Sequence, residues 1–209
     1  MASTRLTTGR LEAFSDGVFA IAITILVLEL SVPAVSGEHL LDAFLAQWPS
    51  YLAYLVTFAT IGVAWLMHTA ITEYLHGADT TLVRLNLLLL LLVSFLPFPT
   101  SLVAEHIDDY EGERVAAMIL GINLLLVAVV VSTMWRYAVD HQLVRPDARD
   151  EEVQVLTRRL TPSMAGYVAV ILIGYFFPLV AVFGYLLIAL LLMVPLGLDR
   201  NDDLEEPAT

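Results

Sequence analysis

The chain has 209 residues, of which 58% are hydrophobic and only 15% are charged, and its formal net charge is −12 at pH 7. Soluble domains carry about a quarter of charged residues, so this composition is typical of membrane spans joined by short loops. A chain this acidic repels nucleic acid, which excludes that partner class, and the absence of cysteine excludes disulfides and thiolate metal sites.

Six apolar stretches divide the chain, and each is close to the about 20 residues that a helix needs to cross a bilayer. The last two come from one uncharged run, 162–198, which we divide at Pro178 because proline breaks the helical hydrogen-bond ladder. Pro97 and Pro99 predict a kink or an end in the third stretch. The sequence therefore predicts an all-α fold, a polytopic six-helix transmembrane bundle forming one membrane domain over 1–209, with spans at about 14–32, 50–71, 82–103, 115–137, 161–177 and 179–196 and an acidic cytoplasmic tail over 199–209.

The distribution of arginine predicts how these spans are oriented. Arg5 and Arg10 precede the first span, and further arginines surround the connection between the fourth and fifth, whereas the connections after the first and fifth contain none. The positive-inside rule therefore places both termini in the cytoplasm. The opposite side carries a group of carboxylates over 105–113, which is either a solvated loop or the cation-attracting mouth of a pore.

The first span combines an apolar stripe with a carboxylate. At about 100° per residue, one helical face collects bulky apolar side chains: Phe14, Val18, Ile21, Ile25, Leu28 and Val32. Asp16 lies about 140° from Ile21 on the same helix, and an ionised carboxylate at this depth needs protein or water around it. By periodicity alone, the stripe is an ordinary packing seam and Asp16 a structural ion-pair member.

A few polar side chains occur in the other spans. Trp65 and His68 lie three residues apart and therefore share a helix face, and Asn86 follows in the next span. Such residues form interhelical hydrogen bonds in membrane bundles, and a histidine can also sense protons because it titrates near neutrality. The sequence contains no His-x-x-x-His pair, nucleophile elbow or glycine-rich phosphate loop, so we expect no enzyme activity, no cofactor and no metal site.

One short motif at the start of the first span resembles a known family signature. The segment Arg10-x-x-x-Phe14-Ser15-Asp16 resembles the signature of the transmembrane protein 175 family of potassium channels. It lies at the start of the first span, and the six-span layout with cytoplasmic termini also fits that family. The resemblance implies a multi-pass protein of a prokaryotic plasma membrane that forms a homotetramer around a central pore in the lipid bilayer and conducts potassium ions.

The resemblance also implies roles for individual residues. In this family, bulky apolar side chains of the first helix form the constriction in place of a carbonyl filter, and here those positions are Ile21, Ile25 and Leu28. Thr24 lies beside them and offers hydroxyls to a permeating ion. The family's interhelical network around the pore helix corresponds to Arg10, Ser15, Asp16, Trp65, His68 and Asn86.

Two functions remain in competition at this point. The first is a potassium-permeable cation channel with a hydrophobic constriction, which serves as a gate by excluding water. The alternative is an ion-coupled secondary transporter that uses Asp16 and His68 for its coupling ions. Transporters often show inverted repeats and mid-membrane sites, whereas the first and last three spans are not alike here and Asp16 lies near a helix end.

Overall fold

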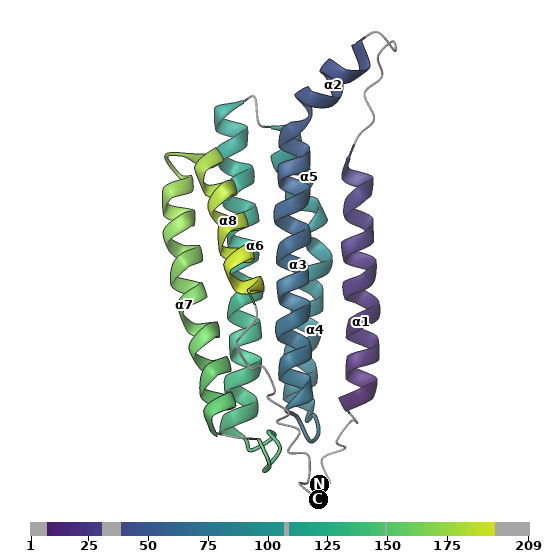
Figure 1. Cartoon of the computed structure of the whole chain (residues 1–209), viewed down its shortest axis with the longest axis vertical. Coiled ribbons are helices and arrows are strands. Elements are labelled where there is room, and N and C mark those ends of the chain that lie inside the picture. The colour runs from purple at the N-terminus through teal and green to yellow at the C-terminus, as the bar shows by residue number, and fades with distance from the viewer. Residues whose placement is uncertain (1–7, 31–38, 107–108, 149, 195–209) are drawn as a thin grey trace, which may run out of the picture.

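The computed structural model describes residues 8–30, 39–106, 109–148 and 150–194, which fold into helices and short connections (Figure 1). The predicted all-α fold is confirmed for this part of the chain. The end of the predicted stripe at Val32 and the tail over 199–209 lie outside the described residues. The elements are α1 (Thr8–Ile25), η1 (Leu26–Glu29), α2 (Leu40–Ala46), α3 (Trp48–Glu73), α4 (Thr80–Phe95), α5 (Pro97–Glu105), α6 (Tyr110–Asp140), α7 (Asp150–Gly174) and α8 (Pro178–Met193).

Helix length separates the elements into two groups. Within the described residues, four helical segments are long and apolar enough to cross a membrane: Thr8–Glu29, Trp48–Glu73, Thr80–Glu105 and Tyr110–Asp140. At about 1.5 Å per residue, each is longer than the about 30 Å of a hydrocarbon core. The segments Met164–Gly174 and Pro178–Met193 are apolar but shorter. The structure therefore supports four spans by length and composition, and the count of six stays a prediction.

Prolines and capping side chains decide where these helices begin and end. α4 stops at Phe95 and α5 starts at Pro97, which confirms the kink predicted there. α7 ends at Gly174 and α8 begins at Pro178, so the break falls beside the proline at which we divided that run. The Asp79 carboxylate caps α4 by accepting a hydrogen bond from the Leu82 N–H at 2.8 Å.

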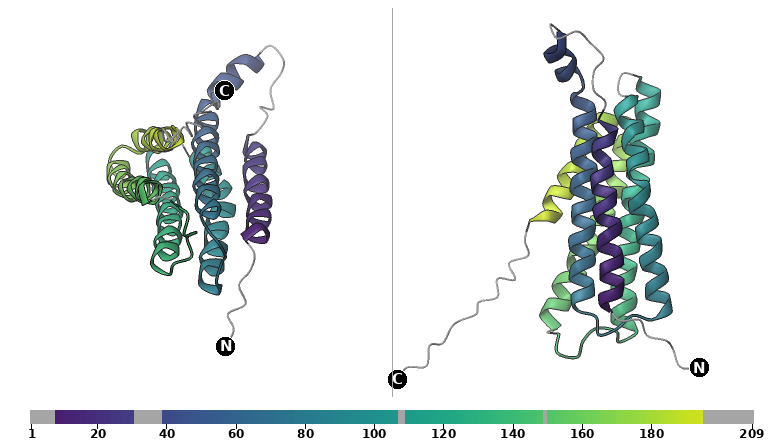
Figure 2. Two further views of the ribbon diagram at one scale, coloured as in Figure 1. Left: turned by 60° about the horizontal axis from the view of Figure 1, so that its bottom comes forward. Right: turned by 90° about the vertical axis from the view of Figure 1, so that its right-hand side faces the viewer.

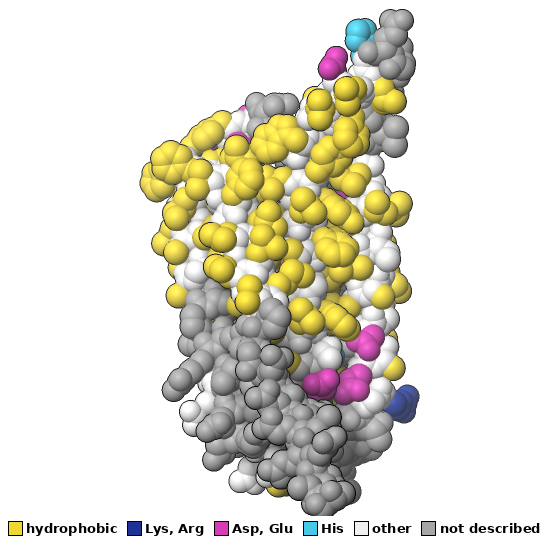
Figure 3. Space-filling model, viewed as in Figure 1, with side chains coloured by type: hydrophobic (Ala, Val, Ile, Leu, Met, Phe, Trp, Pro, Cys, Tyr) yellow, Lys and Arg dark blue, Asp and Glu magenta, His cyan; other side chains and the backbone are white. Residues whose placement is uncertain are grey.

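The helices form a bundle in which α1 occupies one edge. α6, α7 and α8 pack together on one side, whereas α1 contacts α3 and α4 on the other (Figures 1 and 2). Between these groups lies a core of aliphatic side chains without solvent exposure, including Ile61, Leu89 and Leu120. Apolar side chains also cover the middle of the visible surface, while carboxylates lie towards its ends (Figure 3). This distribution is typical of a protein surrounded by lipid.

One end of the bundle is closed by a contact between two connections. The α3–α4 and α6–α7 connections pair through an antiparallel bridge between Leu75 and Val144. The Arg145 N–H donates to the Tyr74 carbonyl at 2.8 Å beside this bridge. These backbone hydrogen bonds hold the starts of α4 and α7 against the end of α6.

Candidate pore-lining helix and its polar anchor

α1 presents two different faces. Its buried side chains follow helical spacing and point towards α3 and α4: Leu11, Ser15, Phe19, Ala22 and, in η1, Leu26. The predicted stripe lies on another face, where Ile21 is 60% and Leu28 is 77% exposed. The remaining helices of the chain therefore leave the bulky apolar stripe uncovered, and it is not a packing seam within the described chain.

Two further members of this face behave in the same way. Phe14 is 57% and Ile25 is 41% exposed, whereas Val18 is half-buried at the margin. Thr24 is also exposed, and its hydroxyl donates to the Ala20 and Ile21 carbonyls at 2.9 Å each. With its proton used inside the helix, the Thr24 oxygen presents lone pairs on the uncovered face.

A buried hydrogen-bonded triad joins α1 to its neighbours. The Asn86 amide donates to Ser15 Oγ at 2.9 Å, and the Ser15 hydroxyl donates to the Leu11 carbonyl at 2.8 Å. Asn86 Oδ1 lies 2.9 Å from His68 Nε2, and this oxygen can only accept, so the histidine donates its proton. His68, Ser15 and Asn86 are each at most 1% exposed. The structure thus brings together three of the predicted network residues from α1, α3 and α4.

A second contact lies beside this triad. The Trp65 indole N–H donates to Asp16 Oδ1 at 2.9 Å, which supplies the partner that a carboxylate at this depth needs. No hydrogen bond joins Asp16 to His68, so the two residues on which the transporter hypothesis depends belong to separate contacts. Arg10 is exposed and forms no hydrogen bond or ion pair with the residues described here, unlike the other predicted network members.

The Phe19 ring completes the anchor from the apolar side. It lies 5.6 Å from the His68 ring, centre to centre, and is 3% exposed. The α1 helix is therefore held on one face by both packing and hydrogen bonds, while Phe14, Ile21 and Leu28 on the stripe stay largely exposed. Such an arrangement fixes the direction in which the uncovered face points.

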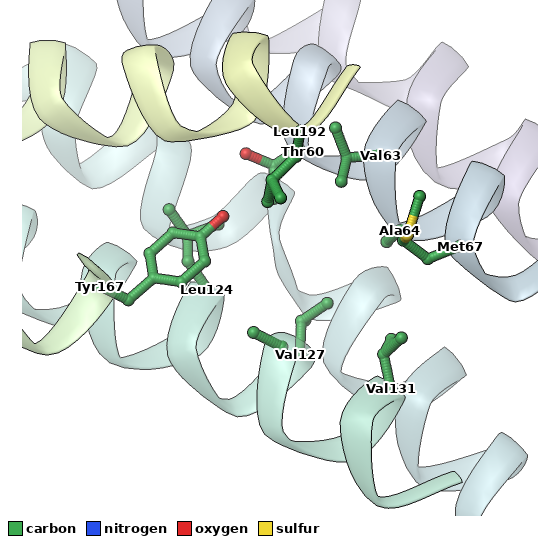
Figure 4. Close-up of a pocket in the computed structure, with 10 residues that line it drawn as sticks. Thr60, Val63, Ala64, Met67, Leu124, Val127, Val131, Tyr167 and Leu192 are labelled. Atoms are coloured by element: carbon green, nitrogen blue, oxygen red, sulfur yellow. The ribbon is translucent and has the colours of Figure 1, made fainter. Parts of the chain in front are cut away.

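A small cavity elsewhere in the bundle is not part of this site. It measures about 30 Å³ and lies between α3, α6, α7 and α8 (Figure 4). Its walls are largely aliphatic, and Thr60, one of its polar members, already donates to the Val56 carbonyl at 2.8 Å. None of the described residues that line it is charged. Within the described ranges there is also no group of three or more His, Asp or Glu side chains that could hold a metal ion.

Several polar contacts between helices were not predicted from the sequence, among them Thr57–Thr100, Trp135–Thr157 and a contact at the start of α4. The Tyr137 hydroxyl of α6 donates to Asp79 Oδ2 at 2.6 Å, so the capping residue of α4 is tied to α6. The signal was present, since an aspartate directly before a helical apolar run is a common start of a helix. The tyrosine partner carried no such signal.

The chain is also similar to known proteins over most of its length. A family model described as the endosomal/lysosomal potassium channel TMEM175 matches residues 10–97. A potassium channel of Chamaesiphon minutus is 44% identical over 73% of this chain and 76% of its own length. A potassium channel of a Chryseobacterium species is 31% identical over 91% of this chain and 94% of its own length.

A solved structure extends the likeness to the fold. The crystal structure of a lysosomal potassium-selective channel TMEM175 homologue from Chamaesiphon minutus superimposes with a TM-score of 0.79. It is 36% identical and covers 88% of this chain and 95% of its own. The matched family is one of ion channels and not of enzymes. The signature, the all-α membrane fold and these relatives together establish that the chain belongs to the TMEM175 family of potassium channels.

Proposed function

We propose that four copies of this chain surround a central pore lined by α1, and that this pore conducts potassium ions. The observation that carries the proposal is the uncovered apolar stripe on α1, with Ile21 60% and Leu28 77% exposed. Apolar side chains on the outer helices, such as Leu172 and Leu191, are exposed to a similar degree, so lipid or another copy of the chain must cover each of these surfaces, and we assign the α1 stripe to other copies. Relatives over most of the chain are named potassium channels.

The constriction follows from the size of these side chains. Four copies of Ile21, Ile25 and Leu28 projecting into one axis make stacked apolar rings, and narrow apolar rings exclude water. A closed pore is then a dewetted pore. A small rotation or outward shift of α1 widens the rings, admits water and opens the channel.

The polar anchor sets the direction of α1 in this proposal. Ser15 is bound to Asn86, and Asp16 to Trp65, so α1 turns as a unit with α3 and α4. These contacts lie away from the stripe, and they stay intact while the stripe faces the pore. Arg10, which is also part of the predicted network, lies one helical turn before Phe14 and is exposed.

Selectivity in such a pore comes from hydration. Potassium holds its water less tightly than sodium, so a narrow wet ring favours potassium modestly. The exposed oxygen of Thr24 supplies a ligand that replaces part of the lost hydration shell.

The arginine distribution completes the proposal. Both termini lie in the cytoplasm, because the connections richest in arginine are those on that side. The chain forms one membrane domain of six spans, in which α7 and α8 supply the last two. Bacterial relatives favour the plasma membrane of a prokaryote as the location.

The test is potassium efflux from liposomes that contain the purified protein, with sodium measured in parallel. Ile21→Asn introduces a polar side chain into the proposed ring, and we expect faster flux with a smaller preference for potassium. Ile122→Asn is the matched control, since Ile122 is 47% exposed on α6, away from the stripe.

The outcomes separate the competing functions. Flux that exceeds transporter turnover and responds to Ile21→Asn but not to Ile122→Asn supports the channel. The proposal is contradicted if both substitutions change the flux equally. It is also contradicted if the wild-type protein and the Ile21→Asn variant form intact tetramers and both show only slow flux.

A further inference from the structure

A groove lies beside the proposed constriction, between α1 and the break that separates α4 from α5. Its volume is about 490 Å³. Ile21 and Ile25 form part of one wall, and Phe95 and Phe98 form part of the other. The groove is therefore continuous with the uncovered face of α1 and reaches the level of the proposed apolar rings.

Glu29 is the charged side chain of this groove. It is the last residue of η1, which continues α1, and it is half-buried. Among the described residues, no arginine or histidine lines the groove, and Glu29 takes part in no hydrogen bond or ion pair. A carboxylate between apolar walls attracts a cation more strongly than one in open water, because the walls lower the local dielectric constant.

Two serine oxygens face the same space. Ser94 and Ser101 line the groove, and their hydroxyls donate to the Leu91 and Phe98 carbonyls at 3.0 Å each. Since these protons are used within α4 and α5, the hydroxyl oxygens present lone pairs to the groove. Carboxylate and hydroxyl oxygens are the ligands that hard cations prefer.

We propose that Glu29, together with Ser94 and Ser101, forms a cation-binding site that concentrates monovalent cations beside the constriction. The site rests on the proposed function, because Ile21 and Ile25 line the same groove. Ile25 and Glu29 are four residues apart, which is about one helical turn. In an assembly of several copies, the Glu29 side chains form a ring of carboxylates at one mouth of the pore, as in other cation-selective pores.

The first test is the unitary current of single channels in planar bilayers. Glu29→Gln lowers the current that enters from the Glu29 side by about twofold or more at low ionic strength, since the local cation concentration falls. The reduction shrinks in concentrated salt, where charges are screened within about 3 Å. Asp42→Asn is the matched control, because Asp42 is an exposed carboxylate on α2 and outside the groove lining.

A second test compares one variant before and after chemical modification, so that a difference in folding between two variants cannot cause the result. The chain has no cysteine, so Glu29→Cys can be modified at a single known position. A negatively charged methanethiosulfonate reagent should restore the unitary current, and a positively charged one should lower it by a further twofold or more. Reversal of the current change with the sign of the reagent identifies charge, and not side-chain volume, as its cause.

The outcomes distinguish this proposal from the proposed function. If Ile21→Asn changes the current but neither Glu29→Gln nor the charged reagents do, the cation site is wrong and the channel stands. If Glu29→Gln and Asp42→Asn lower the current equally, the effect comes from the general surface charge and the site is likewise wrong. If no variant conducts and Ile21→Asn has no effect, the channel itself is contradicted.

Discussion

The two long helices α1 and α6 differ in hydropathy and in burial, and the more apolar helix is the more buried one. The most apolar window of α6 has a mean hydropathy of 2.7, against 2.0 for α1, yet 56% of the α6 window is buried and only 28% of the α1 window. Hydropathy alone would assign the more apolar helix to the lipid. The chain instead surrounds α6 with its own helices and leaves α1 at the edge.

This difference indicates that the two helices have different structural roles in the bundle. α6 contacts α3, α4, α5, α7 and α8 and serves as the scaffold. α1 is held through a narrow buried face that contains Ser15, and its remaining surface is free for other copies of the chain and for a pore. Substitutions on α6 should therefore act on stability, and those on the uncovered face of α1 on conduction.

A pair of glycines gives the largest expected effect. A Cβ on Gly121 of α6 would lie 2.0 Å from the Tyr185 hydroxyl and 2.8 Å from Ile171, whereas a Cβ on Gly17 of α1 would meet no atom within 4 Å. Gly121→Ala should therefore lower the free energy of unfolding by about 1–3 kcal/mol, the usual cost of overpacking. Gly17→Ala should cause no loss. Unfolding in detergent, followed by tryptophan fluorescence, checks both, and an equal loss in the two variants would contradict the comparison.

Two asparagines extend the test to hydrogen bonds. Asn86→Leu removes the partner of both Ser15 and His68, and we expect a loss of about 1–2 kcal/mol, near the upper range for interhelical bonds in membranes. Asn123→Leu on α6 removes one bond, from its amide to the Leu92 carbonyl at 3.2 Å, and should cost less. The same unfolding measurement ranks the two. A larger loss for Asn123→Leu would show that α1 is not anchored mainly through the triad.

Much of this organisation was predictable from the sequence. Hydropathy located the long spans, and Pro97 and Pro178 marked helix breaks because proline removes a backbone donor. The period of about 3.6 residues placed Ile21 and Leu28 on one face. The family signature led to His68 and Asn86 as partners around Ser15.

Other features could not be predicted, for physical reasons. Periodicity identifies a stripe but contains no information on whether the same chain covers it, so the exposure of Ile21 required the structure. The choice of Trp65 as the partner of Asp16 depends on how α1 and α3 are rotated, which no local pattern fixes. The groove beside Glu29 exists only because α1 lies against the α4–α5 break.

Substitution of two tryptophans, Trp65 and Trp135, tests the comparison between α1 and α6 with a smaller expected loss of stability. Trp65→Phe removes the donor to Asp16, and Trp135→Phe on α6 removes a similar bond to Thr157 Oγ1 at 2.8 Å. Each loss should be about 0.5–1 kcal/mol, since a single hydrogen bond contributes little net stability. Potassium flux separates them: Trp65→Phe should change it because α1 is released on one side, and Trp135→Phe should not. A flux that changes in both variants would mean that conduction follows bundle stability alone.

The smallest expected effect concerns the link between α4 and α6, and it depends on pH. Burial of the Asp79 carboxyl opposes its ionisation, but hydrogen bonds from the Leu82 N–H and the Tyr137 hydroxyl outweigh this and lower its pKa below the ordinary value. Because the folded pKa is lowered, the stabilisation is complete above the ordinary pKa and is lost as the pH falls through the lowered one. Tyr137→Phe should thus cost about 0.5–1 kcal/mol at neutral pH, and the difference from wild type should shrink below about pH 4. Tyr54→Phe, which removes a hydroxyl without a hydrogen-bond partner among the described residues, is the control and should show no such convergence. If the cost of Tyr137→Phe were the same at both pH values, Asp79 would not be held by its charge, and the tie between the two helices would be one of packing.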